Sequence, residues 1–579
     1  MLRARSALAL ALAGCCPAAS STAPTTPTPP DSGGKAVEPV GVEPARETKI
    51  DGGTLAIAVN GAPAGTEGFE VRRVGDEIVV ENHVDMTVAG QAVRGRGELR
   101  YDAEGRPLRG VLAMSVSGTA IATSLAGGPD AMVATVKVGE AAAKEQRATG
   151  SIDVFLDSTS FAHYAALCSS EKPRLMAFPG IPVKRGAVRE ANGARVVTFD
   201  VASMVALDVY CDGVRFLALD VPAQGLTVTR TGEEARVTAL RKKPREKPAL
   251  PEGLVELERT VEVPAAPGVE PAKLGCSLLV PVSHRDVKKR MTKGPERALP
   301  GVIFITGSGT QDRDEDTYGP GGLKLSIFRT MAIELGKAGI ASLRCDDRGS
   351  GASTGSLVDV TLRTYTADAA ATMAALRAEP AVNPAKTGII GHSEGAIIAP
   401  LATLTLAPKP RALVLMAGTG RPFDVVLDEQ ALGAMQRAGM AEAEIAKEMA
   451  KRKAVYEALR AGKPLPTDLA PAEAKAWSTD QAWLVSHLRH DPAATAAKVK
   501  RVAVLVAQGA LDQQVAVADA DALEAALKKQ NKVTKKVYPG LNHLFAATKT
   551  GDISEYAAPE AEVDATFLAD VVRFLTANL

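Results

Sequence analysis

The chain has 579 residues, and 68 Lys and Arg residues nearly balance 67 Asp and Glu residues, giving a formal net charge of +1. So small a charge argues against a protein dedicated to nucleic acids or acidic polymers, because both classes usually carry a basic footprint. Aromatic residues make up only 4% of the chain, which disfavours large stacking platforms for nucleic-acid bases. The length suggests roughly two to four domains, each able to bury a core.

Residues 1–14 have the pattern of an export signal. Arg3 and Arg5 precede an apolar run that is too short to cross a bilayer, which needs about 20 apolar residues. The run ends in Leu12-Ala13-Gly14-Cys15. This resembles the bacterial lipobox, in which the cysteine thiol receives diacylglycerol and becomes the mature N-terminus. We therefore expect lipidation at Cys15 and a protein anchored to a membrane of the cell envelope, facing the periplasm or exterior; plain secretion is the alternative.

Two segments of different character follow the signal. Residues 15–47 are rich in Pro, Ser, Thr and Gly, a composition that favours a solvated tether over a packed core. Residues 48–245 contain short runs of β-branched residues separated by turn residues, and these runs include 70–74, 77–88, 205–210 and 237–240. Such spacing predicts a β-rich domain, an antiparallel sandwich or a curved sheet. It contains no evident catalytic cluster, so its role stays open between binding, spacer and lid.

A basic stretch broken by prolines, 241–248, is interpreted as a solvated linker. Beyond it, in 252–579, buried strand-like runs alternate with helical patterns. We expect strands at 302–306, 340–345, 387–390, 412–416, 502–507 and 533–538. We expect helices at 326–337, 365–377, 395–406, 516–529 and 561–576. This alternation predicts a mostly parallel sheet with helices on both faces, the α/β class.

Residues 422–497 interrupt this alternation and look almost wholly helical, which indicates a helical cap between two strands of the sheet. The only tryptophans of the chain, Trp477 and Trp483, both lie in it. They either line an apolar substrate pocket or pack the core of the cap.

The six cysteines divide into three pairs along the chain. Cys15 and Cys16 belong to the processing site. Cys168 and Cys211 could form a disulfide, because an exported chain enters an oxidising compartment, although the sequence alone does not prove the pairing. Cys276 and Cys345 lie in apolar strand-like runs and are interpreted as buried thiols. No Cys and His residues have the spacing of a zinc site, and we expect no metal.

The segment Gly391-His392-Ser393-Glu394-Gly395 has the form G-x-S-x-G and lies between a predicted strand and a predicted helix. A sharp strand-to-helix turn forces the serine into a strained conformation and requires small neighbours. It raises the hydroxyl above the sheet and brings the N–H of Glu394 to the reaction centre. The pattern predicts that Ser393 is a nucleophile.

A serine nucleophile needs a base, and the base needs an acid that orients it. His543 follows the last predicted strand, and Asp512 follows the strand before it. The order Ser393, Asp512, His543 is that of the α/β-hydrolases, and each residue falls at the carboxyl end of a strand. Asp424 and Glu429 are the alternative acids. The other nearby histidines, His392 in the elbow and His487 and His490 in the cap, are expected to pack or to be solvated.

Two further motifs precede the elbow. The loop from Thr306 to Asp314 (TGSGTQDRD) contains glycines that let backbone N–H groups approach an oxyanion, and Ser308 is the expected second donor. The turn from Arg344 to Ser353 (RCDDRGSGAS) is expected to be mainly structural.

Taken in order, these motifs resemble the α/β-hydrolases of the serine esterase and serine aminopeptidase-like group. In that group a His-Gly-Ser-Gly-Pro-Gln-Asp-Arg-Asp loop is common, and here Thr306 and Thr310 replace the His and the Pro. The resemblance covers about 252–579. It implies the α/β-hydrolase fold and catalysis that needs no cofactor.

The leading hypothesis is a serine hydrolase that cleaves small carboxylic esters through an acyl-serine. A peptidase or thioesterase with the same triad is the alternative among enzymes; Glu394 or Asp314 would then supply the acidic group that binds a substrate amine. A third reading is an envelope binding lipoprotein in which the hydrolase fold is inert. No nucleic-acid partner is expected, and the oligomeric state stays open.

Overall fold

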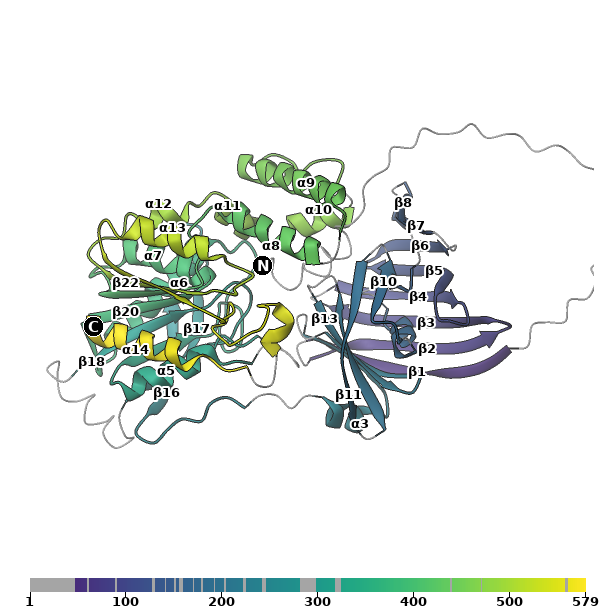
Figure 1. The fold of residues 1–579 in the computed structure, drawn as a ribbon, viewed down its shortest axis with the longest axis horizontal. Helices are drawn as coiled ribbons and strands as arrows, with labels where there is room; N and C mark the ends of the chain where they lie inside the picture. Colours follow the sequence, from purple (N-terminus) through teal and green to yellow (C-terminus); the bar gives the residue numbers. More distant parts are fainter. Residues whose placement is uncertain are drawn as a thin grey trace, which may run out of the picture.

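The computed structural model describes residues 47–579 except 60–61, 89–90, 128–130, 141, 150–151, 156–159, 170, 179–180, 192, 202–204, 222–224, 242–245, 282–297, 318–323, 438–439, 470 and 558–560. The predicted signal, Cys15 and almost all of the tether lie outside the described residues. The rest forms two sheets that share no strand (Figure 1). Among the described residues, no helix is long and apolar enough to span a membrane.

The first sheet has 15 strands, and nearly all of them pair with their sequence neighbours in antiparallel fashion. The strands are β1 (Glu47–Val59), β2 (Ala62–Val74), β3 (Glu77–Val88), β4 (Gln91–Tyr101), β5 (Pro107–Val116), β6 (Thr119–Gly127), β7 (Ala131–Val138), β8 (Lys144–Thr149), β9 (Val154–Phe155), β10 (Arg174–Phe178), β11 (Ile181–Ala191), β12 (Ala194–Val201), β13 (Val205–Asp212), β14 (Arg215–Val221) and β15 (Leu226–Arg230). The first and last strands, β1 and β15, pair in the middle of the sheet, while β8 and β9 form its edges. The predicted β-rich, antiparallel region is confirmed.

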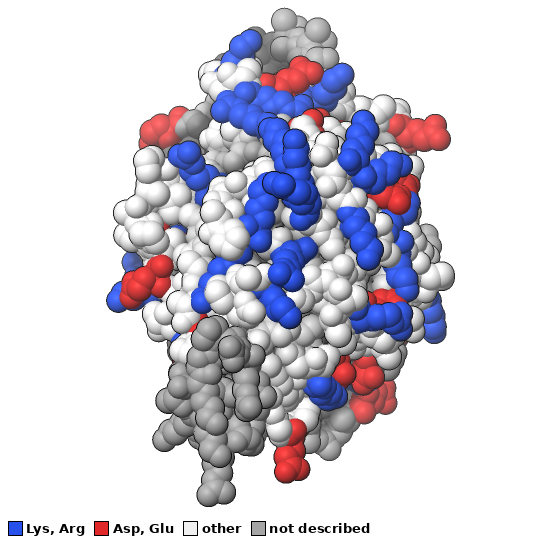
Figure 2. All heavy atoms as spheres, turned by 90° about the vertical axis from the view of Figure 1, so that its left-hand side faces the viewer, with Lys and Arg blue, Asp and Glu red and all other residues white. Residues whose placement is uncertain are grey.

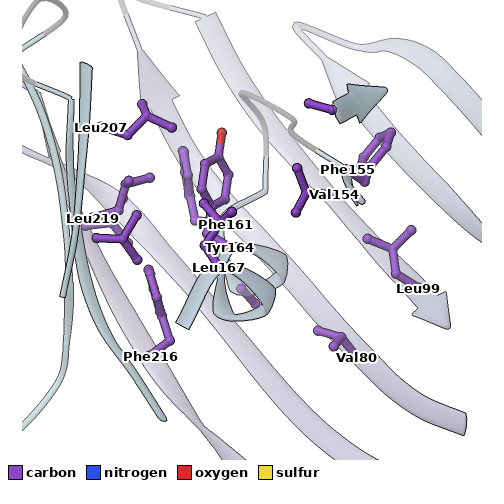
Figure 3. Packing of buried hydrophobic residues seen from close by; sticks show 14 of the residues in the cluster. Val80, Leu99, Val154, Phe155, Phe161, Tyr164, Leu167, Leu207, Phe216 and Leu219 are labelled. Carbon is purple, nitrogen blue, oxygen red and sulfur yellow. The ribbon is translucent and has the colours of Figure 1, made fainter. Parts of the chain in front are cut away.

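A short helical segment, η1 (Ala162–Ala165) and α2 (Ala166–Ser169), packs inside this sheet. In Figure 3 its Phe161 and Leu167 side chains lie between residues of β3 and β4 on one side and residues of β13 and β14 on the other. The buried Glu67 carboxylate accepts the N–H groups of Phe161 and Ala162 at 2.7 and 3.1 Å. Those donors would otherwise be unsatisfied at the start of the helical turn, so Glu67 fixes the segment to β2.

Two predictions for this region have definite outcomes. Cys168 of α2 and Cys211 of β13 form a disulfide, as the oxidising compartment suggested. The prediction of a strand at 237–240 is wrong, because these residues end the helix α3 (Glu234–Leu240). Val237 and Leu240 are buried at a spacing of three residues, which places both on one helix face.

The second sheet has eight strands in the order β16-β17-β19-β18-β20-β21-β22-β23. They are β16 (Val255–Val263), β17 (Ala272–Val280), β18 (Leu299–Ile305), β19 (Ala341–Cys345), β20 (Val382–His392), β21 (Ala412–Met416), β22 (Ala503–Gly509) and β23 (Lys532–Tyr538). The first two pair antiparallel, and β18 to β23 are parallel. Parallel strands with buried residues on both faces need helices on both sides.

Helices supply that cover (Figure 1). One face of the sheet is covered by α6 (Leu362–Ala378), α7 (Glu394–Thr405) and α13 (Val517–Leu527), and the other by α5 (Ile327–Lys337) and α14 (Ala565–Asn578). The strands and helices lie within a few residues of their predicted positions. The C-terminal domain has the predicted α/β-hydrolase fold.

The excursion between β21 and β22 consists of helices, as expected for a cap. These are α8 (Phe423–Arg437), α9 (Glu442–Ala461), α10 (Pro471–Ser478), α11 (Gln481–Leu488) and α12 (Pro492–Ala496). Trp477 and Trp483 are 1% and 2% exposed and belong to one buried apolar cluster with Tyr456 and Phe423. The tryptophans therefore pack the core of the cap.

The interpretation of Cys276 and Cys345 as thiols is wrong, because they form a second disulfide. The two residues lie directly opposite each other on the antiparallel strands β17 and β19. Their separation of 69 residues gave no sign of this pairing, since a register between distant strands depends on the whole sheet.

Candidate active site

Ser393 occupies a strained turn between β20 and α7, with φ 53° and ψ −113°. A Cβ atom on Gly391 would lie 2.2 Å from the carbonyl oxygen of Gly395, and one on Gly395 would lie 2.2 Å from that of Ile305. Real Cβ atoms do not approach carbonyl oxygens so closely, so both positions require glycine. The turn has the geometry predicted for a nucleophile elbow, and it leaves Ser393 only half-buried.

Asp512 and His543 meet at the same edge of the sheet. The two side chains share a 2.7 Å hydrogen bond between Nδ1 of His543 and Oδ2 of Asp512. Oδ1 of Asp512 accepts the N–H groups of Gln514 and Val515 at 2.7 and 2.9 Å. These donors orient the carboxylate, and the carboxylate keeps the proton of a neutral His543 on Nδ1. Nε2 is then left as a base.

His392 connects His543 to the elbow. Its Nε2–H donates to the backbone carbonyl of His543 at 2.9 Å, and the centroids of the two rings are 4.7 Å apart. Since His392 directly precedes Ser393, these contacts hold the imidazole of His543 beside the elbow turn.

The alternative acids have other partners. Asp424 pairs with Arg460 at 2.6 Å, and both carboxylate oxygens of Glu429 accept hydrogen bonds from Arg421. The only carboxylate bonded to the His543 ring, among the described residues, is that of Asp512.

Two residues of the predicted oxyanion loop are held by one carboxylate. The Thr306 hydroxyl and the Gln311 N–H both donate to Asp347, whose pKa burial raises well above its usual range. A Cβ atom on Gly307 would lie 3.3 Å from that of Ser393, so the loop lies against Ser393. Within the described residues, the N–H of the half-buried Ser308 has no acceptor. This loop can therefore present a donor beside Ser393.

A small cavity of about 60 Å³ lies between this loop and α7. Its walls include Thr306, Gly307, Glu394, Phe304 and Ile398. Among the described residues, no cluster of His, Cys, Asp and Glu is arranged to hold a metal ion.

The two carboxylates considered for binding a substrate amine are already engaged. Glu394 Oε1 accepts the Trp483 Nε1–H at 2.7 Å and lies 2.9 Å from His487 Nε2. These contacts join the cap helix α11 to the elbow. His487 is buried rather than solvated. Asp314 is buried and pairs with Arg344 and Lys247.

The turn from Arg344 to Ser353 contributes a network of buried ion pairs. Asp346 receives the guanidinium fork of Arg313 with both bonds at 3.0 Å, and Arg348 pairs with Asp368. This agrees with a structural role. In the predicted linker, of which 242–245 lie outside the described residues, Lys247 is exposed and pairs with Asp312 as well as with Asp314.

One arrangement beside the candidate active site was not predicted from the sequence. Glu315 Oε1 accepts the Gly307 N–H at 2.9 Å and lies 2.7 Å from Nδ1 of the buried His392. Burial alone would lower the pKa of His392, but the Glu315 carboxylate outweighs it and the pKa is raised. His392 and Glu315 thus tie together the oxyanion loop, the elbow and the loop that carries His543.

We expect Glu315→Gln to lower kcat for the reaction at Ser393 by about ten- to a hundredfold, because small misplacements of catalytic groups have effects of that size. The raised pKa keeps His392 cationic at higher pH, so its bond to Glu315 is present at low pH and is lost as the pH rises through that pKa. The alkaline limb of the kcat profile should therefore move to lower pH in the variant. Glu429→Gln, which alters a surface ion pair, is the control. An unchanged kcat and pH profile in Glu315→Gln would refute the role.

Comparison with known proteins gives one family match. The model of the family described as serine aminopeptidase, S33, matches residues 324–547, a segment that includes Ser393, Asp512 and His543. No curated protein matches.

Solved structures of esterases are similar to part of this chain at low identity. An esterase of Pyrococcus furiosus is 16% identical, with 55% of this chain and 91% of that chain covered and a TM-score of 0.35. Acetyl xylan esterase 1 from Thermoanaerobacterium sp. is 14% identical, with 69% and 87% covered and a TM-score of 0.32. Carboxyl esterase 2 from the fungus Tuber melanosporum is 16% identical, with 58% and 90% covered and a TM-score of 0.34. At such TM-scores the likeness carries no argument about activity, which rests on the site itself.

Proposed function

We propose that this chain, whose C-terminal domain is an α/β-hydrolase, is a serine hydrolase that cleaves carboxylic esters through an acyl-serine intermediate. The observation that carries the proposal is the hydrogen bond between His543 and Asp512 at the sheet edge where the strained elbow holds Ser393. A base with a fixed tautomer beside a serine in such a turn is the arrangement that makes a hydroxyl nucleophilic.

The reaction would proceed in two halves. Nε2 of His543 takes the proton of the Ser393 hydroxyl while the oxygen attacks the ester carbonyl. The N–H groups of Glu394 and Ser308 donate to the resulting oxyanion. His543 then gives its proton to the departing alcohol, leaving the acyl-serine. In the second half a water molecule loses a proton to His543 and attacks the acyl carbonyl, and the acid is released as Ser393 regains its proton.

We take the small cavity beside the elbow as the candidate site of the acyl group, because its walls include Gly307 and Glu394, which adjoin Ser393; the triad side chains themselves do not line it. A cavity of about 60 Å³ is far smaller than the pockets that enclose drug-sized ligands, which measure roughly 300–1,000 Å³. An acetyl or propionyl group matches this space better than a long chain.

A serine peptidase is the second candidate, and the match to a serine aminopeptidase family supports it. A free amino group on the substrate would need a carboxylate to bind it, and Glu394 and Asp314 already have partners. We therefore rank ester hydrolysis first. Thioester hydrolysis uses the same steps and is an alternative activity of the same triad.

The two activities separate in one substrate screen. The purified protein should hydrolyse p-nitrophenyl acetate and propionate, and kcat/KM should fall as the acyl chain lengthens. Aminoacyl p-nitroanilides should be cleaved slowly or not at all. Fast amide cleavage without ester turnover would reverse the ranking.

We also propose that the protein is held on a membrane of the bacterial envelope by a lipid on Cys15, facing the periplasm or exterior. The lipobox-like Leu12-Ala13-Gly14-Cys15 supports this, and two disulfides fit an oxidising compartment. Replacing Cys15 by Ser should move the protein out of the acylated membrane fraction. A Cys15→Ser variant with unchanged membrane partitioning and the same N-terminus would contradict lipidation.

A further inference from the structure

Nine cationic side chains gather where four segments meet at one end of the hydrolase sheet. The segments are 383–387, 407–411, 497–501 and 528–532, and they contain no Asp or Glu. We call the nine residues the basic face: Lys386, Lys409, Arg411, Lys498, Lys500, Arg501, Lys528, Lys529 and Lys532. Eight of them are exposed, and Lys386 is half-buried. In a chain whose net charge is +1, such a cluster is a strong local asymmetry.

The strand register brings these residues together. Ala412 of β21 lies opposite Ala503 of β22, which lies opposite Lys532 of β23. Arg411 directly precedes β21, and Arg501 lies two residues before β22, the strand that separates β21 from β23. Lys532 begins β23, and neighbouring strands lie about 4.8 Å apart. Figure 2 shows Lys and Arg spread over this end of the molecule, with Asp and Glu mostly toward its edge. Arg501, Lys528, Lys529 and Lys532 also surround an open hollow.

The basic face lacks counter-charges of its own. Within the described residues, none of the nine side chains forms an ion pair with a carboxylate. By contrast, Lys535 and Lys536, further along β23, pair with Asp521 and Asp570. Like charges that are gathered without partners repel one another. Because no carboxylate of the protein neutralises these cations, an external anionic surface would be attracted by all of their charge.

The face lies at the opposite end of the sheet from the active site. Strands β20 to β23 are parallel, so their amino ends, which carry the basic face, are separated by the length of the sheet from their carboxyl ends, which carry Ser393, Asp512 and His543. A surface bound at the basic face would leave the active site free and turned away from it.

We propose that the basic face binds the surface of a membrane rich in anionic phospholipids. Seven of the nine residues are lysines, which act as flexible point charges and suit a diffuse anionic plane better than a single bidentate phosphate site. The four segments contain no Phe, Tyr or Trp on which nucleic-acid bases could stack, and none of them contains a large apolar side chain that is exposed. The contact is therefore electrostatic and peripheral. It does not depend on the hydrolase activity.

The test uses the full chain with Cys15→Ser, so that no lipid anchors the protein. Binding is measured by cosedimentation with vesicles of phosphatidylcholine alone and with vesicles containing about one-third phosphatidylglycerol. Vesicles of phosphatidylcholine alone report whatever the N-terminal segment contributes. We expect more protein to sediment with the anionic vesicles than with vesicles of phosphatidylcholine alone. This difference should vanish at high salt, because salt screens the charges.

Two sets of four substitutions in this background locate the binding surface. Changing Lys500, Arg501, Lys529 and Lys532 to Gln should weaken anionic-vesicle binding by about tenfold or more, while turnover of a soluble ester stays unchanged. The control changes Arg73, Lys137, Lys453 and Lys463 to Gln, which removes the same charge from exposed positions elsewhere. The control set should bind almost as well as the parent. Equal losses in both sets, no excess binding to anionic vesicles, or a loss confined to binding of a labelled RNA would overturn the proposal.

Discussion

Replacing Ser393 by alanine should lower kcat for ester hydrolysis by roughly a million-fold, the scale seen when the nucleophile of a triad is removed. The reason is specific to this turn. The backbone at φ 53° and the two glycines place the side chain of residue 393 at the reaction centre, and alanine lacks the oxygen that attacks the ester. Hydrolysis rates with p-nitrophenyl acetate measure the effect.

The control for this variant is Ser478→Ala, which removes a hydroxyl from an exposed position of the cap. It should keep full activity. Circular dichroism should show that Ser393→Ala is folded, since the substitution removes one oxygen atom and keeps the Cβ atom and the backbone of the turn. A Ser393→Ala protein that retains a tenth or more of the activity would remove the proposed nucleophile.

Asp512→Asn should lower kcat by about ten-thousand-fold while leaving the fold intact. Oδ1 of Asp512 accepts two backbone N–H groups, so the asparagine oxygen must stay at that position. The amide NH₂ is then forced to face Nδ1 of His543, where the carboxylate oxygen now lies at 2.7 Å. A donor there moves the proton of the imidazole to Nε2, and the base can no longer accept the serine proton.

Asp424→Asn is the matched control, because Asp424 was the alternative acid and pairs with Arg460 instead. It should leave kcat within about twofold of the wild type, as surface ion pairs contribute little. Full activity in Asp512→Asn together with a large loss in Asp424→Asn would transfer the role of the acid.

Local signals in the sequence were sufficient for most of the hydrolase domain. The alternation of apolar runs and helical patterns placed the strands from β18 to β23, because strands buried on both faces have a distinctive continuous hydrophobicity. The elbow was found because a sharp turn after a strand leaves no room for Cβ atoms at Gly391 and Gly395, and this requirement is visible in the sequence as G-x-S-x-G. Asp512 and His543 followed from the positions of strand ends.

Features that depend on pairing between distant segments were missed or left open. The pairing of β1 with β15 and the disulfide between Cys276 and Cys345 both follow from register across a sheet, which no local pattern encodes. The role of His392 was undervalued for the same reason, since its partner Glu315 lies 77 residues away. The helix at Glu234–Leu240 was mistaken for a strand because a short apolar run fits both periods.

Reaction of the unmodified protein with a fluorophosphonate probe, followed by mass spectrometry of the labelled peptide, tests the central claim most directly. The probe reacts with a serine oxygen only when a base has made it nucleophilic. We predict a single adduct on Ser393, absent in Ser393→Ala and formed far more slowly in His543→Ala. A folded protein that remains unlabelled, or that carries the adduct on another residue, would contradict the account.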